Sequence, residues 1–178
     1  MRRAALAASA VAVAASAFTG SAAAVERESQ IGLELGVPML VVHGNTSTVA
    51  SGASAGLHYT YGLSDAFNLI ADADSGVLFL GVPKPATLTH ADVGLAYVLD
   101  VLQWVPWGGA EVGAYGLTGS SVGGTFLPGA ALSVGLDYRF NRSWAAGVVV
   151  REHLFFTNIN LFPSLTEGFL RVGYTWGW

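Results

Sequence analysis

Alternation between apolar residues and small or polar ones is the feature that most constrains the fold of this chain. In residues 31–37, isoleucine, leucine and valine alternate with glycine and glutamate. Successive side chains of a β-strand point to opposite faces, so this period of two predicts strands with two unlike faces. Eight such segments follow one another along the chain: 31–37, 55–62, 67–74, 92–99, 109–115, 130–139, 144–153 and 167–178.

The charged residues of these segments nearly all share one parity with most of the glycines, and Glu152 is the main exception. The lumen of an eight-stranded barrel is only wide enough for side chains to fill it. We therefore expect the small and charged face inside and the leucine, tyrosine and tryptophan face outside. The predicted inward charges are Glu34, His58, Asp72, Asp74, Asp92, Glu111, Asp137, Arg139, Arg151, His153, Glu167 and Arg171.

The composition favours a membrane for this barrel. Only 11% of the residues are charged, against about 25% in an ordinary soluble domain. No run after the first segment approaches the ~20 apolar residues of a membrane helix, and a closed barrel is the other structure that satisfies every backbone group in lipid. The sequence therefore predicts a single eight-stranded antiparallel up-and-down transmembrane β-barrel. A soluble, lipocalin-like barrel is the alternative.

Residues 1–24 have the features of a cleaved signal peptide. Arg2 and Arg3 precede an apolar core over residues 4–18, and three alanines end the segment. An uncleaved N-terminal anchor is the alternative. Removal of residues 1–24 leaves six basic and twelve acidic residues, a net charge of −6 without a basic stripe for nucleic acid. There is no cysteine, so disulfides and thiolate–metal sites are excluded. Residues 25–178 then form one barrel domain.

The predicted connections alternate in length. Long ones fall at 38–54, 75–89, 117–128 and 154–166, and short ones at 64–65, 100–107 and 141–143. Short periplasmic turns and longer outer loops are typical of outer-membrane barrels. Aromatic residues near segment ends predict the two interfacial girdles: Tyr59, Tyr61, Tyr97, Trp104, Trp107, Tyr138 and Trp144.

The last segment resembles the C-terminal signal of bacterial outer-membrane barrels, in which alternating apolar residues end on an aromatic residue. The residues concerned are Leu170, Val172, Tyr174, Trp176 and Trp178. The segments YGLSDAFNL (61–69) and VGLDYRFNRSWAAG (134–147) also look like hairpins of small OmpA-, OmpX- and OmpW-type barrels. The resemblance implies the membrane topology and insertion by the barrel assembly machinery. We expect a monomer in the bacterial outer membrane, in contact with its lipid.

The inward charges are expected to form a network, because an isolated ion away from water is costly. Arg171 with Glu34 is the preferred pair, since strands one and eight meet when a barrel closes. The predicted function is a structural or small-solute-passage role without catalysis, cofactor or metal.

Two other functions stay open. Adhesion or partner binding is suggested by the apolar segment 154–162, which could instead extend the strands. A lipid A-modifying enzyme would need a nucleophile and a base, for which the sequence offers His90, His153, Ser120 and Ser121 without a spacing that ties them together. The four histidines, His43, His58, His90 and His153, are too scattered in sequence to predict a metal site, and Asp72 with Asp74 suggests a solvated rim.

Overall fold

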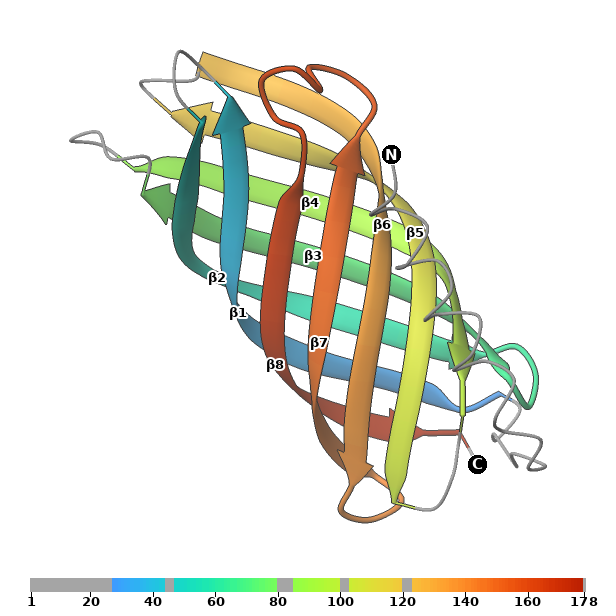
Figure 1. Ribbon diagram of the computed structural model, residues 1–178. Helices are drawn as coiled ribbons and strands as arrows, with labels where there is room; N and C mark the ends of the chain where they lie inside the picture. The colour runs from blue at the N-terminus through green and yellow to red at the C-terminus, as the bar shows by residue number, and fades with distance from the viewer. Residues whose placement is uncertain (1–26, 44–46, 80–84, 100–102, 120–122, 178) are drawn as a thin grey trace, which may run out of the picture.

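The computed structural model describes residues 27–43, 47–79, 85–99, 103–119 and 123–177. They form a closed antiparallel barrel in which each strand pairs with its neighbours in sequence and β8 pairs with β1 (Figure 1). This confirms the predicted eight-stranded up-and-down barrel. The strands are β1 Ser29–His43, β2 Ser47–Gly62, β3 Phe67–Phe79, β4 Ala86–Val98, β5 Trp104–Gly119, β6 Gly123–Arg139, β7 Trp144–Phe155 and β8 Leu165–Trp176.

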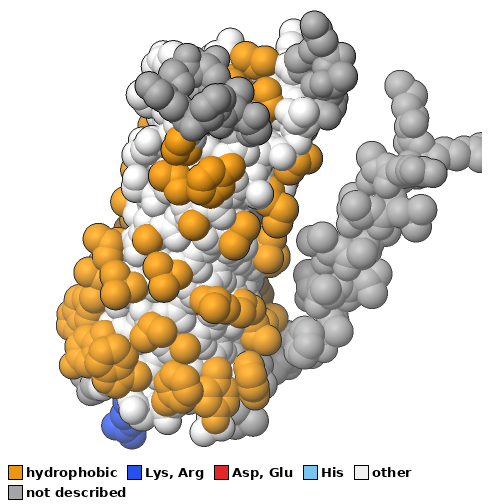
Figure 2. All heavy atoms as spheres, turned by 90° about the vertical axis from the view of Figure 1, so that its left-hand side faces the viewer, with side chains coloured by type: hydrophobic (Ala, Val, Ile, Leu, Met, Phe, Trp, Pro, Cys, Tyr) orange, Lys and Arg blue, Asp and Glu red, His pale blue; other side chains and the backbone are white. Residues whose placement is uncertain are grey.

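The apolar face is on the outside of the barrel, as the parity of the charges predicts. On β1, Leu33 is 65% exposed while the next residue, Glu34, is 1% exposed. Hydrophobic side chains cover much of the wall seen in Figure 2, most densely toward its lower end. An outer wall of this kind can face lipid but not water, so the fold is that of a transmembrane barrel. Within the described part of the chain, no helix has the length and apolarity needed to cross a membrane.

Glu152 is the outward-parity exception noted in the sequence. It lies on the wall between β7 and β8, where its carboxylate accepts a hydrogen bond from Thr166 Oγ1 at 2.5 Å. The hydroxyl of a neighbouring strand thus partners a charge that would otherwise face lipid alone.

The two ends of the barrel differ. One end, which we call the terminal end, holds Arg27, Gly177 and the connections 63–66, 99–103 and 140–143. The opposite end, the loop end, holds the connection 156–164 and the strand ends His43, Ser47, Phe79, Ala86, Gly119 and Gly123. Most of the long loops predicted from the sequence are wrong, because the strands continue through the proline- and glycine-containing segments. Among the connections that the structure describes from end to end, 156–164 is the longest.

Aromatic side chains gather on the outer wall near the terminal end. The rings of Trp104 and Tyr138 lie 4.8 Å apart between centroids, and those of Trp144 and Tyr174 lie 5.2 Å apart. Aromatic rings at this level are typical of a membrane–water interface. Trp107 is a correction, since it lies in the lumen and is 8% exposed. The strand β5 starts at Trp104, so the alternation carries Trp104 outward and Trp107 inward.

The connection 156–164 folds back over the loop end. Asn158 has a positive φ of 56°, and its carbonyl accepts hydrogen bonds from the amides of Leu161 and Phe162, both at 2.9 Å. This turn inserts Phe162 into the barrel, where it is 1% exposed. A strand extension was the expected structure for most of this segment, but β7 ends at Phe155.

Candidate functional site

The lumen is the candidate functional site, and it is built in layers. At the loop end lies an apolar plug of buried side chains: Leu40, Ala50, Leu78, Ala86, Leu88, Tyr115, Leu117, Leu127, Phe155, Phe162 and Leu165. Toward the terminal end lies a second apolar cluster: Ile70, Ala96, Val98, Val105, Trp107, Val149 and Phe169. The buried charged side chains lie in the same lumen. The expectation of a polar lumen is therefore wrong for the loop end, where longer strands carry leucines inward.

Arg151 on β7 is the centre of the first group of charges. Its Nη1 and Nη2 donate to Glu34 Oε2 and Oε1 at 2.8 and 3.1 Å, and Nη2 also donates to Asp72 Oδ1 at 2.6 Å. Asp74 Oδ2 lies 3.5 Å from Nη1. The guanidinium also packs over the ring of Phe169, 5.0 Å from its centroid. A planar fork of five donors suits such a cluster of carboxylates.

Arg171 on β8 forms the second group. It donates through Nε to Asp137 Oδ1 at 2.8 Å and through Nη2 to the other carboxylate oxygen of Asp137. Its guanidinium lies 4.4 Å from the ring centroid of Trp107, a cation–π distance. Glu34, the partner expected from the sequence, is directly opposite Arg171 in the β1–β8 register, with Oε1 at 3.8 Å from Nη1. Arg171 therefore touches both carboxylates and makes its hydrogen bonds to Asp137.

A third group, which we call the histidine cluster, consists of His90, His153, Tyr115, Asp92 and Glu167. His90 Nδ1 lies 2.7 Å from Asp92 Oδ2, and Tyr115 donates its hydroxyl proton to Asp92 Oδ1. His153 Nδ1 lies 2.9 Å from the Tyr115 oxygen. Both Nε2 atoms turn to Glu167 Oε2, at 2.8 Å from His90 and 3.0 Å from His153.

The other predicted lumen charges have local partners. Ser133 Oγ donates to Glu111 Oε1 at 2.6 Å, and His58 Nδ1 lies 3.3 Å from Glu34 Oε1. Arg139 lies nearer the terminal end, half-buried, with Nη2 at 3.3 Å from Glu28 Oε2.

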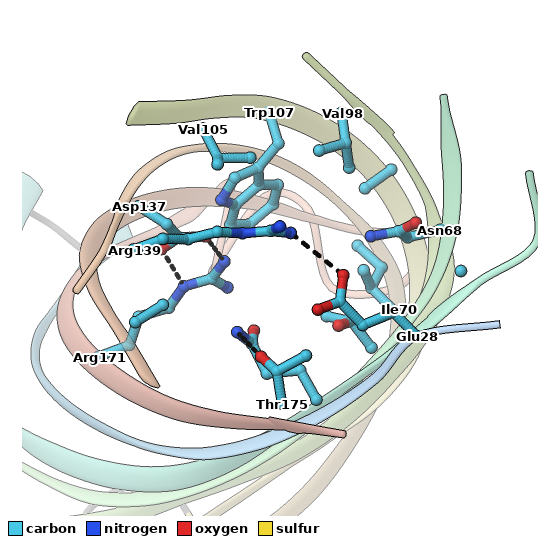
Figure 3. A pocket seen from close by; sticks show the side chains of 15 residues that line it. Glu28, Asn68, Ile70, Val98, Val105, Trp107, Asp137, Arg139, Arg171 and Thr175 are labelled. Carbon is cyan, nitrogen blue, oxygen red and sulfur yellow. Dashed lines mark hydrogen bonds and ion pairs between the residues drawn. The ribbon is translucent and has the colours of Figure 1, made fainter. Parts of the chain in front are cut away.

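A small cavity of about 50 Å³ opens beneath the charges at the terminal end. Arg139 reaches across it toward Glu28, while Arg171 points back to Asp137 (Figure 3). Gln30 Nε2 donates to Thr175 Oγ1 at 3.2 Å on its other side. The cavity has room for a few waters but not for a drug-sized ligand, which occupies a pocket of about 300–1,000 Å³.

His90 and Tyr115 are the two members of the histidine cluster that the list of inward charges leaves out. Tyr115 lies on the predicted inward face of its segment, but the list includes only charged residues and histidines. His90 lies two residues before Asp92, so a fourth segment that began at residue 86 would have placed it inside. Its distance in sequence from His153 and Glu167 concealed the cluster, because β4 meets β7 and β8 only across the lumen.

The remaining site residues lie elsewhere. Leu170, Val172, Tyr174 and Trp176 are exposed on the outer face of β8, while Trp178 is outside the described residues. Ser120, Ser121 and the signal-peptide segment 1–24 are also outside them. His43 is exposed at the loop end of β1. His90 and His153 are enclosed in the lumen rather than placed on the lipid-facing wall, where a lipid substrate would lie.

No protein-family model matches the chain, and no curated protein matches its sequence. Solved structures do match. Neisserial surface protein A (NspA) has a TM-score of 0.65 at 14% identity over 83% of this chain and 95% of its own. Ail, the attachment invasion locus protein of Yersinia pestis, has 0.59 at 13% over 85% and 100%. The outer membrane protein OprG from Pseudomonas aeruginosa has 0.59 at 12% over 89% and 100%. The chain thus has the fold of the small eight-stranded β-barrels of bacterial outer membranes.

Proposed function

We propose that this protein is a closed, lipid-embedded barrel of the bacterial outer membrane with a structural role and no catalysis. One observation carries the choice of a structural role over solute passage. The buried ion network fills the lumen, and the apolar plug with Phe162 covers it at the loop end. Ions cross neither layer without displacing buried side chains, because the one polar group of the plug, the Tyr115 hydroxyl, is already hydrogen-bonded to Asp92 and the other side chains offer nothing to replace the ions' water.

Planar-bilayer recording of the purified, folded protein tests this proposal. We expect no conductance steps from the wild type, whose plug is intact. We expect none from Arg171→Ala either, since this change does not touch the plug. Phe162→Ala removes the ring that covers the loop end, and Phe156→Ala in the same connection is the matched control because Phe156 is 61% exposed. Steady conductance of the wild type would overturn the proposal.

Heat-modifiable migration tests the membrane barrel itself. A folded outer-membrane barrel stays compact in detergent until it is boiled, so we expect one band to shift on boiling. A water-soluble protein without a shift would contradict the barrel in lipid.

We also propose that the barrel is a monomer inserted by the outer-membrane assembly machinery. The β1–β8 pairing leaves no unpaired edge among the described strands, so no partner strand is needed to complete the sheet. The exposed aromatic and apolar residues of β8 are the segment that the machinery would read. Light scattering of the detergent-solubilised protein should give one chain per micelle, and a stable dimer would contradict the monomer.

Adhesion through the loop end is the second candidate. Phe156, Ile159 and Leu161 are exposed on the connection that Phe162 anchors. Ail, one of the structural neighbours, is named for attachment and invasion. Serine at all three positions should leave the heat shift unchanged and lower the adhesion of cells that display the barrel. Equal adhesion of both cell types would exclude this candidate.

A further inference from the structure

We propose that the histidine cluster is a binding site for one divalent transition-metal ion of the zinc class, held by His90, His153 and Glu167. One ligand atom from each of these buried residues lies within 4.8 Å of the others. Two imidazoles and one glutamate form a known set of protein ligands for zinc. The proposal concerns the inside of the barrel and does not depend on whether the lumen conducts.

In neutral imidazoles, the hydrogen bonds of the cluster leave both Nε2 atoms with a free lone pair. Tyr115 donates its only proton to Asp92, so its oxygen can accept but not donate toward His153. His153 therefore carries its proton on Nδ1. His90 likewise donates from Nδ1 to the Asp92 carboxylate at 2.7 Å. A second hydrogen bond that fixes the tautomer in this way is typical of metal-binding histidines.

The Nε2 lone pairs and the Glu167 carboxylate then converge on one place. Both Nε2 atoms face the same oxygen, Glu167 Oε2, at separations of 2.8 Å for His90 and 3.0 Å for His153. Among the described residues, neither Nε2 atom nor either Glu167 oxygen has a hydrogen-bond partner. With both imidazoles neutral, three electron-rich groups this close repel one another unless a cation lies between them, and the ion we propose removes that repulsion.

The dimensions fit a metal ion after a small adjustment. With bonds of about 2.0–2.1 Å, two ligands of a tetrahedral zinc lie about 3.4 Å apart. The present separations are a few tenths of an ångström shorter, so the side chains need only move slightly apart. Asp74 Oδ2 lies 3.8 Å from His90 Nε2 and has no hydrogen-bond partner among the described residues, so it borders the fourth position.

The charges of the lumen also call for a cation. Among the described residues, seven buried carboxyl groups share the lumen with two buried arginines and three buried histidines, so the carboxylates outnumber the permanent cations. Arg151 and Arg171 are already bonded to Glu34, Asp72 and Asp137, so none of their hydrogen bonds goes to Glu167 or Asp92. A divalent ion in the histidine cluster supplies positive charge where the arginines do not reach.

The first experiment measures metal retained by the folded barrel. Because the cluster is enclosed, the mature chain is refolded in detergent with Zn²⁺, treated with EDTA, and passed over a gel-filtration column. We expect about one zinc per wild-type barrel by elemental analysis. His153→Gln and His90→Gln each lose a ligand and should retain at least about tenfold less zinc. Zinc should raise the unfolding midpoint of the wild type but not that of His153→Gln or His90→Gln.

His58→Gln is the matched control, because His58 is a buried lumen histidine outside the cluster. It should retain zinc like the wild type. Equal loss from His58→Gln and His153→Gln, or a wild type that retains less than a tenth of an equivalent, would overturn the proposal.

A measurement on the wild type alone covers the case in which a variant does not fold. X-ray absorption at the zinc edge should show two imidazole ligands, with oxygen atoms as the remaining ligands. A shell of oxygen ligands without imidazole would place the ion elsewhere and overturn the proposal. Substitution of Mg²⁺ for Zn²⁺ during refolding should leave no retained metal, since magnesium prefers oxygen ligands.

Discussion

Arg151 and Glu34 form a bidentate ion pair that spans the intervening strand β8, with Nη1–Oε2 and Nη2–Oε1 distances of 2.8 and 3.1 Å. The two residues lie on β7 and β1, and the same guanidinium also bonds Asp72 on β3. Arg151 therefore ties together strands that are not neighbours in the sheet, and the loss of this one cation leaves several carboxylates facing one another.

Arg151→Met should strongly destabilise the barrel. Removal of one partner of a buried ion pair costs about 3–5 kcal/mol, because the remaining charges are left uncompensated. Urea unfolding of the refolded barrel, followed by tryptophan fluorescence, measures the change. Arg142→Met, in the exposed turn between β6 and β7, is the control and should change little. A triple change that adds Glu34→Gln and Asp72→Asn should recover part of the loss; equal stability of Arg151→Met and the wild type would contradict the role of the network.

Gly135→Ala should destabilise the barrel although it adds a single methyl group. A Cβ at Gly135 would lie 2.3 Å from the indole of Trp107. Overpacking of this kind costs about 1–3 kcal/mol. Gly108→Ala is the matched control, since its Cβ would have its nearest neighbour, Ser133 O, at 3.7 Å. The same unfolding assay should show a loss for Gly135→Ala only, and the loss should shrink when Trp107 is also replaced by Leu. Similar losses for both glycines would show that Trp107 does not fill the lumen at Gly135.

Val134→Arg should test which side of the wall faces lipid. Val134 is exposed on the outer face of β6, where it pairs with Gly108 and Val150. An arginine on the lipid face near the bilayer midplane costs about 2–4 kcal/mol, and the cost falls toward the interfaces. Phe126→Arg, on the same strand nearer the loop end, should therefore cost less. Unfolding titrations in lipid vesicles give the two values, and a harmless arginine at position 134 would argue against a lipid-facing wall there.

Much of the architecture could be predicted from the sequence because side-chain parity is a local property. The alternation in residues 130–139 predicts which of these residues share a face of the sheet, and this prediction does not depend on the rest of the chain. The same reasoning fixed the outward direction of Leu33 and the inward direction of Glu34. Strand length was less predictable, since the prolines Pro38 and Pro128 lie in segments that the sequence predicts as loops. The closed ladder accommodates them within β1 and β6.

The contacts of the lumen could be predicted only in part. Register places Arg171 opposite Glu34, which follows from closure of β1 on β8. A long side chain, however, reaches beyond its neighbouring strand, as Arg151 does to Glu34, and sequence gives no measure of that reach. The meeting of His90 with His153 depends in the same way on the curvature of the whole barrel. Prediction of the inward position of Trp107 requires the residue at which β5 starts. The apolar run 100–107 gives no sign of that residue.

The charges held by Arg151 also bear on how the barrel is made. Strands β1 and β7 come into position only when β8 pairs with β1, so a sheet that has not yet closed holds Glu34 and Arg151 apart. Such an intermediate exposes unneutralised ions within the bilayer, which makes it costly compared with both the unfolded and the finished state. Insertion of this chain should consequently be an all-or-none event, in which the closing of the sheet brings the cation on β7 to the carboxylates on β1 and β3.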